Sequence, residues 1–197
     1  MNTLKAEKRS MDVKAKRLRR EGYVTGNVFG KKIQGSIPVK MEKKDVDRLL
    51  KTETKGGQIM LDVEGEVYDV LIKEVDYNPL AHTVEEVDFQ ALVSNEMVHS
   101  TAEIILENEE KVLSGVLQDE LKEVAYKALP ADLVDKIKVD VAGMKIGDTL
   151  RVKDLEIAKN KNIHITTDPE AVVATVTPVH NVVPETETEA EETAEEK

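Results

Sequence analysis

Along most of the first 92 residues, apolar side chains alternate with polar ones, a spacing typical of strands that bury one face. Glu64-Gly65 separates two such segments and is a tight-hairpin signal. Pro38 suggests that another segment lies at a sheet edge, because proline has no N–H to donate. The strands predicted in this region are residues 3–6, 24–29, 33–39, 59–63, 67–75 and 84–92.

Two short helices interrupt this strand pattern. The first has apolar residues at i, i+4 and i+7, and we expect Asp12 to cap its start and Gly22 to follow its end. The second is predicted over residues 42–51 from apolar positions at i, i+3 and i+4. The two apolar stripes consist of Met11, Ala15 and Leu18, and of Val46, Leu49 and Leu50.

A short polar stretch at residues 93–98 separates this region from a second one, and we interpret it as a linker. Beyond it, strand candidates follow at roughly regular spacing, with one helical turn at 133–135, which favours a sandwich or an open barrel. We therefore predict a mainly β chain with domains at residues 1–92 and 99–180. The strand candidates of the second domain are residues 102–106, 112–117, 121–129, 137–141, 149–152 and 172–176.

Residues 181–197 form the last predicted segment, which from Pro184 onward is strongly acidic. Such a composition buries too little apolar surface to offset the entropy of ordering, so we expect a disordered tail. The tail either keeps the chain in solution or shields a basic region from unsuitable polyanions.

The residue inventory argues against an enzyme. The absence of cysteine excludes disulfides and thiolate chemistry and suits a reducing cytoplasm, and no nucleotide-binding glycine motif or nucleophile elbow is present. The histidines lie far apart in the sequence, so we predict no catalytic, metal or cofactor site. No apolar run resembles a secretory signal or approaches the roughly 20 residues of a membrane span, so we expect no membrane partner. Since no catalytic motif is present, we also expect no small-molecule substrate. The histidines are His82, His99, His164 and His180.

Charge is distributed unevenly along the chain. The net charge is −11, yet residues 1–57 hold 16 lysines and arginines against 7 aspartates and glutamates, which gives +9. Five of these cations fall between Lys14 and Arg20 with no carboxylate among them. A polyanion such as a phosphate backbone would relieve their mutual repulsion, so we predict an RNA-binding helix here.

Several blocks of sequence carry a family resemblance. Residues 16–22 read K-R-L-R-R-E-G, and V-x-G-x-V-F-G follows at residues 24–30. L-I-K-E-V, N-P and V-D-F follow between residues 71 and 89, and I-G-D-x-L and D-P-x-x-V-V-A-T-V lie in the second domain. Together these blocks resemble the bacterial large-subunit ribosomal protein twenty-five family, which binds 5S rRNA and includes the general stress protein Ctc. The resemblance is to the long, two-domain form and covers about residues 3–178.

The resemblance implies a six-stranded N-terminal β-barrel that binds 5S rRNA in the 50S subunit, with the basic helix and nearby strands against the RNA. The second domain would be all-β and less directly tied to RNA. The implied partners are 5S rRNA and neighbouring 50S proteins. Residues matching family RNA-contact positions are Arg9, Lys14, Arg17, Arg19, Phe29 and Asp88, and we add Lys16 and Arg20 for their charge.

Three positions depart from the family pattern. Thr25 replaces a proline, Asp76 replaces a glutamine and Glu86 replaces a histidine. A carboxylate repels phosphate, although it can accept a hydrogen bond from a guanine or cytosine amino group. These departures therefore bear on affinity and base recognition rather than on the fold.

Three functions are compatible with these observations. The first is a structural constituent of the large subunit that binds 5S rRNA. The second is a stress-associated protein–protein adaptor with weakened or lost RNA binding, which Asp76, Glu86 and the acidic second domain motivate. The third is an anticodon-binding-like module that acts on tRNA.

Overall fold

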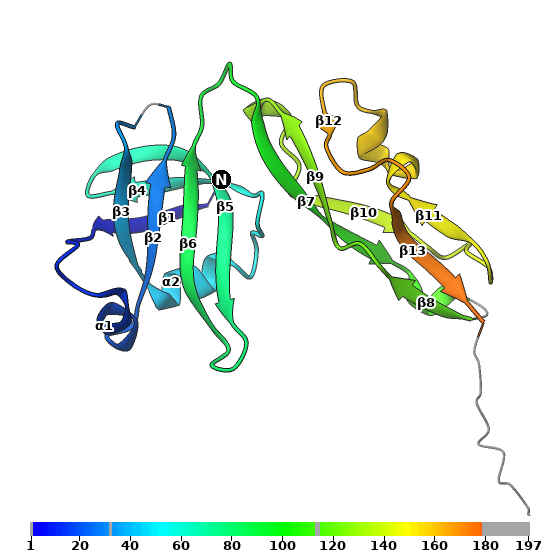
Figure 1. Cartoon of the computed structure of the whole chain (residues 1–197), viewed down its shortest axis with the longest axis horizontal. Helices are drawn as coiled ribbons and strands as arrows, with labels where there is room; N and C mark the ends of the chain where they lie inside the picture. The colour runs from blue at the N-terminus through cyan, green and yellow to red at the C-terminus, as the bar shows by residue number, and fades with distance from the viewer. Residues whose placement is uncertain (1, 32, 113–114, 179–197) are drawn as a thin grey trace, which may run out of the picture.

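The computed structural model describes residues 2–31, 33–112 and 115–178, which form a barrel followed by two further sheets (Figure 1). Strands dominate both parts, so the fold is mainly β, as the alternating pattern predicts. The predicted acidic tail lies outside the described residues. Of the helices that the structure describes, none has the length and apolar character required to cross a membrane.

Six strands close into the N-terminal barrel in the order β1-β3-β2-β6-β5-β4. Neighbouring strands are antiparallel except for the parallel pairs β1–β4 and β2–β6. Aliphatic side chains and Phe89 fill the interior, and Val28, Ile59 and Leu61 have no exposed surface. The barrel strands are β1 (Thr3–Lys8), β2 (Tyr23–Phe29), β3 (Ser36–Glu42), β4 (Gln58–Val63), β5 (Glu66–Asn78) and β6 (Thr83–Ala91).

Two short helices, α1 (Ala15–Arg20) and α2 (Lys43–Leu49), lie against this barrel. The predicted N-cap Asp12 was wrong: Lys14 occupies that position, while the Asp12 carboxylate accepts a hydrogen bond from the Ser10 hydroxyl at 2.9 Å. Because the helix begins later than predicted, Met11 stays 73% exposed and Leu18 alone of its stripe is buried. Gly22 follows the helix at φ +92°, which confirms its predicted place.

The predicted hairpin is confirmed, since Glu64 and Gly65 join β4 to β5 with φ of 54° and 95°. Two positive φ values in a two-residue turn match the twist of the strands. The predicted edge position of Pro38 was wrong, because the barrel is closed. Pro38 lies instead just before β3 pairs with β1, and its carbonyl accepts the Arg9 N–H at 2.9 Å.

The C-terminal part consists of a four-stranded sheet, β10-β7-β9-β12, and a three-stranded sheet, β11-β13-β8. Side chains from both sheets share one core, which contains Tyr126 and Val173. The sequence pattern did not predict β12, the parallel pairing of β10 with β7, or a 3-10 turn at Pro130–Asp132 in place of 133–135. The strands are β7 (Val98–Glu107), β8 (Val116–Asp119), β9 (Glu123–Ala128), β10 (Lys136–Asp140), β11 (Thr149–Arg151), β12 (His164–Ile165) and β13 (Val172–Thr177).

The barrel and the four-stranded sheet meet along the first half of β7. Strand β10 pairs with residues 103–107, the second half of β7. Among the described residues, no strand lies beside the first half of the same edge of β7, which lies against the barrel. Leu71 of the barrel packs there with Leu92 and Val98 in a small apolar cluster. Gly56 fits because a Cβ at this position would lie 1.9 Å from the Thr101 carbonyl oxygen. Since β6 ends at Ala91 and β7 starts at Val98, we propose the linker at 93–98 as the domain boundary.

Gly26 permits the close approach of β2 and β6 that positions the outer face of the barrel. A Cβ at residue 26 would lie 2.0 Å from the Val87 carbonyl oxygen, which is rigid backbone. We expect Gly26→Ala to destabilise the barrel by about 2–3 kcal/mol through overpacking. Urea denaturation measures this change, with Gly143→Ala as control, because a Cβ added at residue 143 would have no atom within 4 Å. An unchanged midpoint for Gly26→Ala would contradict the close approach.

Candidate nucleic-acid interface

The exposed cations of α1 are the first component of the candidate interface. Arg17 donates to Glu21 at 2.9 Å, an exposed pair one turn apart that contributes little in water. Lys14, Lys16 and Arg20 take part in no ion pair within the described part of the chain. Their charges are therefore available to an outside anion. The exposed cations are Lys14, at the N-cap, with Lys16, Arg17 and Arg20.

Arg19 has a different environment from the cations around it. Its guanidinium lies 2.8 Å from the Glu85 carboxylate and 3.7 Å from that of Glu86. Its Nε also donates to the Glu85 carbonyl oxygen at 3.1 Å. Together with buried Leu18, these contacts hold α1 against the barrel beside β2 and β6 (Figure 1). Arg19 thus orients the helix while the neighbouring cations face solvent.

Arg9 lies near the same part of β6. Its Nη2 donates to the Val13 carbonyl oxygen at 3.1 Å, which ties the end of β1 to the segment before α1. Its Nε is buried and has no hydrogen-bond partner among the described residues. The charge of Arg9 also acts on the Glu86 carboxyl. The structure therefore brings Arg9 and Arg19 together around Glu86.

Asp88 is held by the neighbouring strand. Its Oδ1 accepts the backbone N–H of Asn27 at 3.0 Å and the Asn27 side-chain amide at 3.4 Å. These contacts join β6 to β2 at a point where the ladder between them is incomplete. One carboxylate oxygen of Asp88 is thus engaged within the barrel, and the other accepts no hydrogen bond from the described residues.

Four carboxylates form an acidic strip on the outer face of β5 and β6. Glu86 lies opposite Asp76 in the strand register, and Asp88 lies opposite Glu74. Partial burial raises the pKa of the Glu86 carboxyl, Asp88 adds to this effect, and Arg19 opposes it. Sequence reasoning singled out Asp76, Glu86 and Asp88 but missed Glu74, which the alternation of β5 could have revealed.

Phe29 lies away from the exposed cations. It is the last residue of β2, whereas α1 precedes the first, so the length of β2 separates them, about 20 Å at the usual rise per residue. Its ring is half-buried, and its strand neighbours are Ser36 and Gln90. The structure therefore separates Phe29 from the predicted cations and places it nearer Asp88, which is bonded to Asn27, two residues before Phe29.

The interface offers two kinds of recognition. The exposed cations of α1 can pair with phosphates, and the acidic strip can accept hydrogen bonds from the amino groups of bases. Among the residues that the structure describes, no group of three histidine, cysteine or acidic side chains could hold a metal ion. The exposed groups of this face are thus cations that can pair with phosphates and carboxylates that can accept from base amino groups.

Comparisons with known proteins match both parts of the chain. The model of the Ribosomal L25p family matches residues 4–89, and the model of the ribosomal protein TL5 C-terminal domain matches residues 97–180. A relative named "Large ribosomal subunit protein bL25" from Bacillus velezensis is 33% identical over 183 residues, covering 90% of this chain and 89% of the relative. Relatives of the same name from Moorella thermoacetica (33% identical, 91% and 86% covered) and Akkermansia muciniphila (32%, 79% and 79%) are also similar.

The contacts of Arg19 predict a specific effect on α1. Replacing Arg19 with alanine removes its contacts to Glu85 and Glu86, so we expect a loss of about 1 kcal/mol and faster amide exchange at residues 15–21. NMR hydrogen exchange measures this effect, and Arg20→Ala is the matched control because its side chain is exposed. Equal exchange in the two variants would show that Arg19 does not anchor the helix.

Proposed function

The chain belongs to the large ribosomal subunit protein bL25 family, in its long two-domain form, and on this premise we propose that it binds 5S rRNA through α1 and the adjoining outer face of the barrel. The family is structural and non-enzymatic. In this proposal the chain works in the cytoplasm as part of the ribosome, next to other 50S proteins. The adaptor alternative receives no support from the comparisons.

The observation that carries the proposal is the group of exposed cations on α1 in an otherwise acidic chain. Lys14, Lys16, Arg17 and Arg20 face solvent, whereas the net charge of the whole chain is −11. Like charges this close repel one another, and a phosphate backbone would remove that repulsion while releasing counterions. Because RNA helices are recognised mainly through backbone and shape, a rigidly held basic helix is a suitable contact.

The other predicted contact residues take different parts in the proposal. Arg9 and Arg19 position the segment around α1, because Arg9 donates to the Val13 carbonyl oxygen and Arg19 to the Glu85 carbonyl oxygen. Asp88 accepts from a base amino group with the oxygen that Asn27 leaves free. Phe29 is a separate apolar contact near the other end of β2.

The acidic strip limits where phosphates can lie. Its four carboxylates repel a phosphate backbone that crosses β5 and β6, so we place phosphates at α1 and base edges over the strip. This arrangement favours an RNA whose groove is widened by an internal loop, because a regular A-form major groove is too narrow for side chains.

The phosphate contacts predict a strong salt dependence. With roughly four to five contacts, the slope of log K against log salt should be on the order of −3 to −4.5. Changing Lys14, Lys16, Arg17 and Arg20 together to alanine should remove most of this slope and weaken binding more than tenfold at low salt. Filter binding to 5S rRNA measures both quantities.

The control for this experiment carries the same change in net charge. Four exposed lysines of the C-terminal part are changed to alanine, and we expect a slope close to that of the wild type. Equal losses in the two variants would mean that overall charge, rather than α1, governs binding. The control positions are Lys122, Lys145, Lys159 and Lys161.

The raised pKa of Glu86 predicts a pH dependence of RNA binding. At pH 7 the carboxylate is charged and repels phosphate, so Glu86→Gln should bind 5S rRNA a few-fold more tightly than the wild type. As the pH falls through the raised pKa, the wild-type carboxyl is neutralised, and its affinity should approach that of the variant. Binding measured from pH 8 down to pH 4, below the ordinary pKa of a glutamate, tests this, and a constant affinity ratio over that range would rule out Glu86 as the titrating group.

A further inference from the structure

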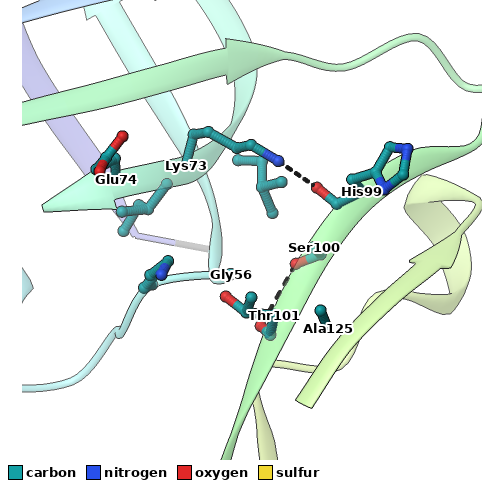
Figure 2. Close-up of a pocket in the computed structure, with 10 residues that line it drawn as sticks. Gly56, Lys73, Glu74, His99, Ser100, Thr101 and Ala125 are labelled. Carbon is teal, nitrogen blue, oxygen red and sulfur yellow. Dashed lines mark hydrogen bonds between the residues drawn. The ribbon is translucent and has the colours of Figure 1, made fainter. Parts of the chain in front are cut away.

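A cleft of about 280 Å³ lies between the barrel and the four-stranded sheet. Its barrel side is formed by Lys55, Gly56 and Lys73, and its other side by His99, Ser100 and Thr101 of β7. Figure 2 shows the Lys73 side chain extending across this cleft toward β7, where its ammonium donates to the His99 carbonyl oxygen at 2.9 Å. Both parts of the chain are therefore needed to form the cleft.

Lys73 reaches the cleft because of an irregularity in β5. The register with β6 shifts between Ile72 and Glu74, which leaves Lys73 without an opposite residue. Such a bulge re-aims a side chain, and bulges are frequent beside functional sites. Figure 2 shows the Glu74 carboxylate farther along β5, turned away from the Lys73 ammonium. The bulge thus places the Lys73 ammonium against β7, while the Glu74 carboxylate, which also lines the cleft, turns away from that ammonium.

Cations accumulate around this cleft. Lys127 lies directly opposite His99 in the register of β7 and β9, and both side chains are exposed. Burial, together with the charge of Lys55, lowers the pKa of Lys73. Burial and the charges of Lys127 and Lys73 lower the pKa of His99. Burial is the main cause of both shifts, the neighbouring lysines add to it, and the charge of Glu74 opposes the shift of the Lys73 pKa.

The carboxylates near the cleft do not neutralise all of its cations. Glu123 lies 3.1 Å from Lys55 and accepts a hydrogen bond from it. Lys73 uses one of its three N–H donors on the His99 carbonyl, and no carboxylate pairs with Lys73 or Lys127 in the described part of the chain. An anion in the cleft would use the remaining donors of Lys73.

We propose that the cleft between the two domains binds a phosphate group, through Lys73 within it and Lys127 at its border, opposite His99 in the register of β7 and β9, with Lys55 and His99 beside them. The group is either a backbone phosphate of RNA or free phosphate, and the RNA case rests on the function proposed above. That case fits the position of the cleft, since Glu74 lines it and also belongs to the acidic strip. RNA over the strip would then meet cations at both borders, α1 on one side and the cleft on the other.

The first experiment tests the site with inorganic phosphate and the full chain. Amide resonances of Gly56, Ser100 and Thr101 are followed by NMR during a phosphate titration at constant ionic strength. We expect saturable shifts at these residues in the wild type and their loss in Lys73→Gln and Lys127→Gln. Lys161→Gln is the control, because this exposed lysine lies outside β5, β7 and β9, the strands that border the cleft.

The second experiment measures 5S rRNA binding by the same variants. If an RNA phosphate occupies the cleft, Lys127→Gln should reduce the magnitude of the salt slope by about 1 and weaken binding several-fold, whereas Lys161→Gln should do neither. If phosphate shifts the amide resonances in a saturable way while the salt slope of 5S rRNA binding is unchanged, the site is supported and its ligand is free phosphate. Because Lys127 is exposed, its replacement should leave the melting temperature unchanged.

Two outcomes overturn the proposal or separate it from the proposed function. If the amide shifts do not saturate with phosphate and the salt slope of 5S rRNA binding is unchanged in the variants, the cleft is not a phosphate site. If the wild type does not bind 5S rRNA at all, the proposed function fails, while the phosphate titration still decides for or against the cleft.

Discussion

The attachment of α1 to the barrel through Arg19 is the interaction on which the candidate interface depends. Six residues form too short a helix to be stable in water, so its orientation must come from tertiary contacts. Arg19 supplies them on β6, and buried Leu18 supplies the apolar part. Because one cation is used internally, its neighbours on the helix are presented to solvent in a fixed arrangement. The same sequence in a disordered arm would carry equal charge without that geometry.

The opposite signs of charge on the barrel have a physical consequence for recognition. Cations on α1 attract any polyanion, whereas the acidic strip beside them repels a backbone that lies across β5 and β6. An RNA must therefore place its phosphates at α1 and keep them away from the acidic strip. A regular duplex, whose phosphates are evenly spaced, meets this requirement poorly. Under the proposed function, this constraint would let a chain with a pI near 5.0 bind RNA selectively rather than indiscriminately.

Much of the fold could be predicted from the sequence, because local signals and the family resemblance agreed. The Glu64-Gly65 hairpin and Gly22 beyond α1 were predictable, since both positions require positive φ. The start of α1 was not, because Asp12 is drawn into a turn with Ser10. Strand β12 has two residues, and β10 pairs with β7 across a long sequence separation, so neither leaves a local pattern. At the site, composition revealed the cations, but only the tertiary structure distinguishes anchoring Arg19 from exposed Arg17 and Arg20.

The central claim is that 5S rRNA contacts α1 and the adjoining face of β6. Hydrogen–deuterium exchange of the full chain, measured by mass spectrometry with and without 5S rRNA, tests it most directly. We expect protection at residues 14–21 and 84–90, with little change at 149–165. Protection confined to the C-terminal sheets, or no protection at low ionic strength, would contradict it.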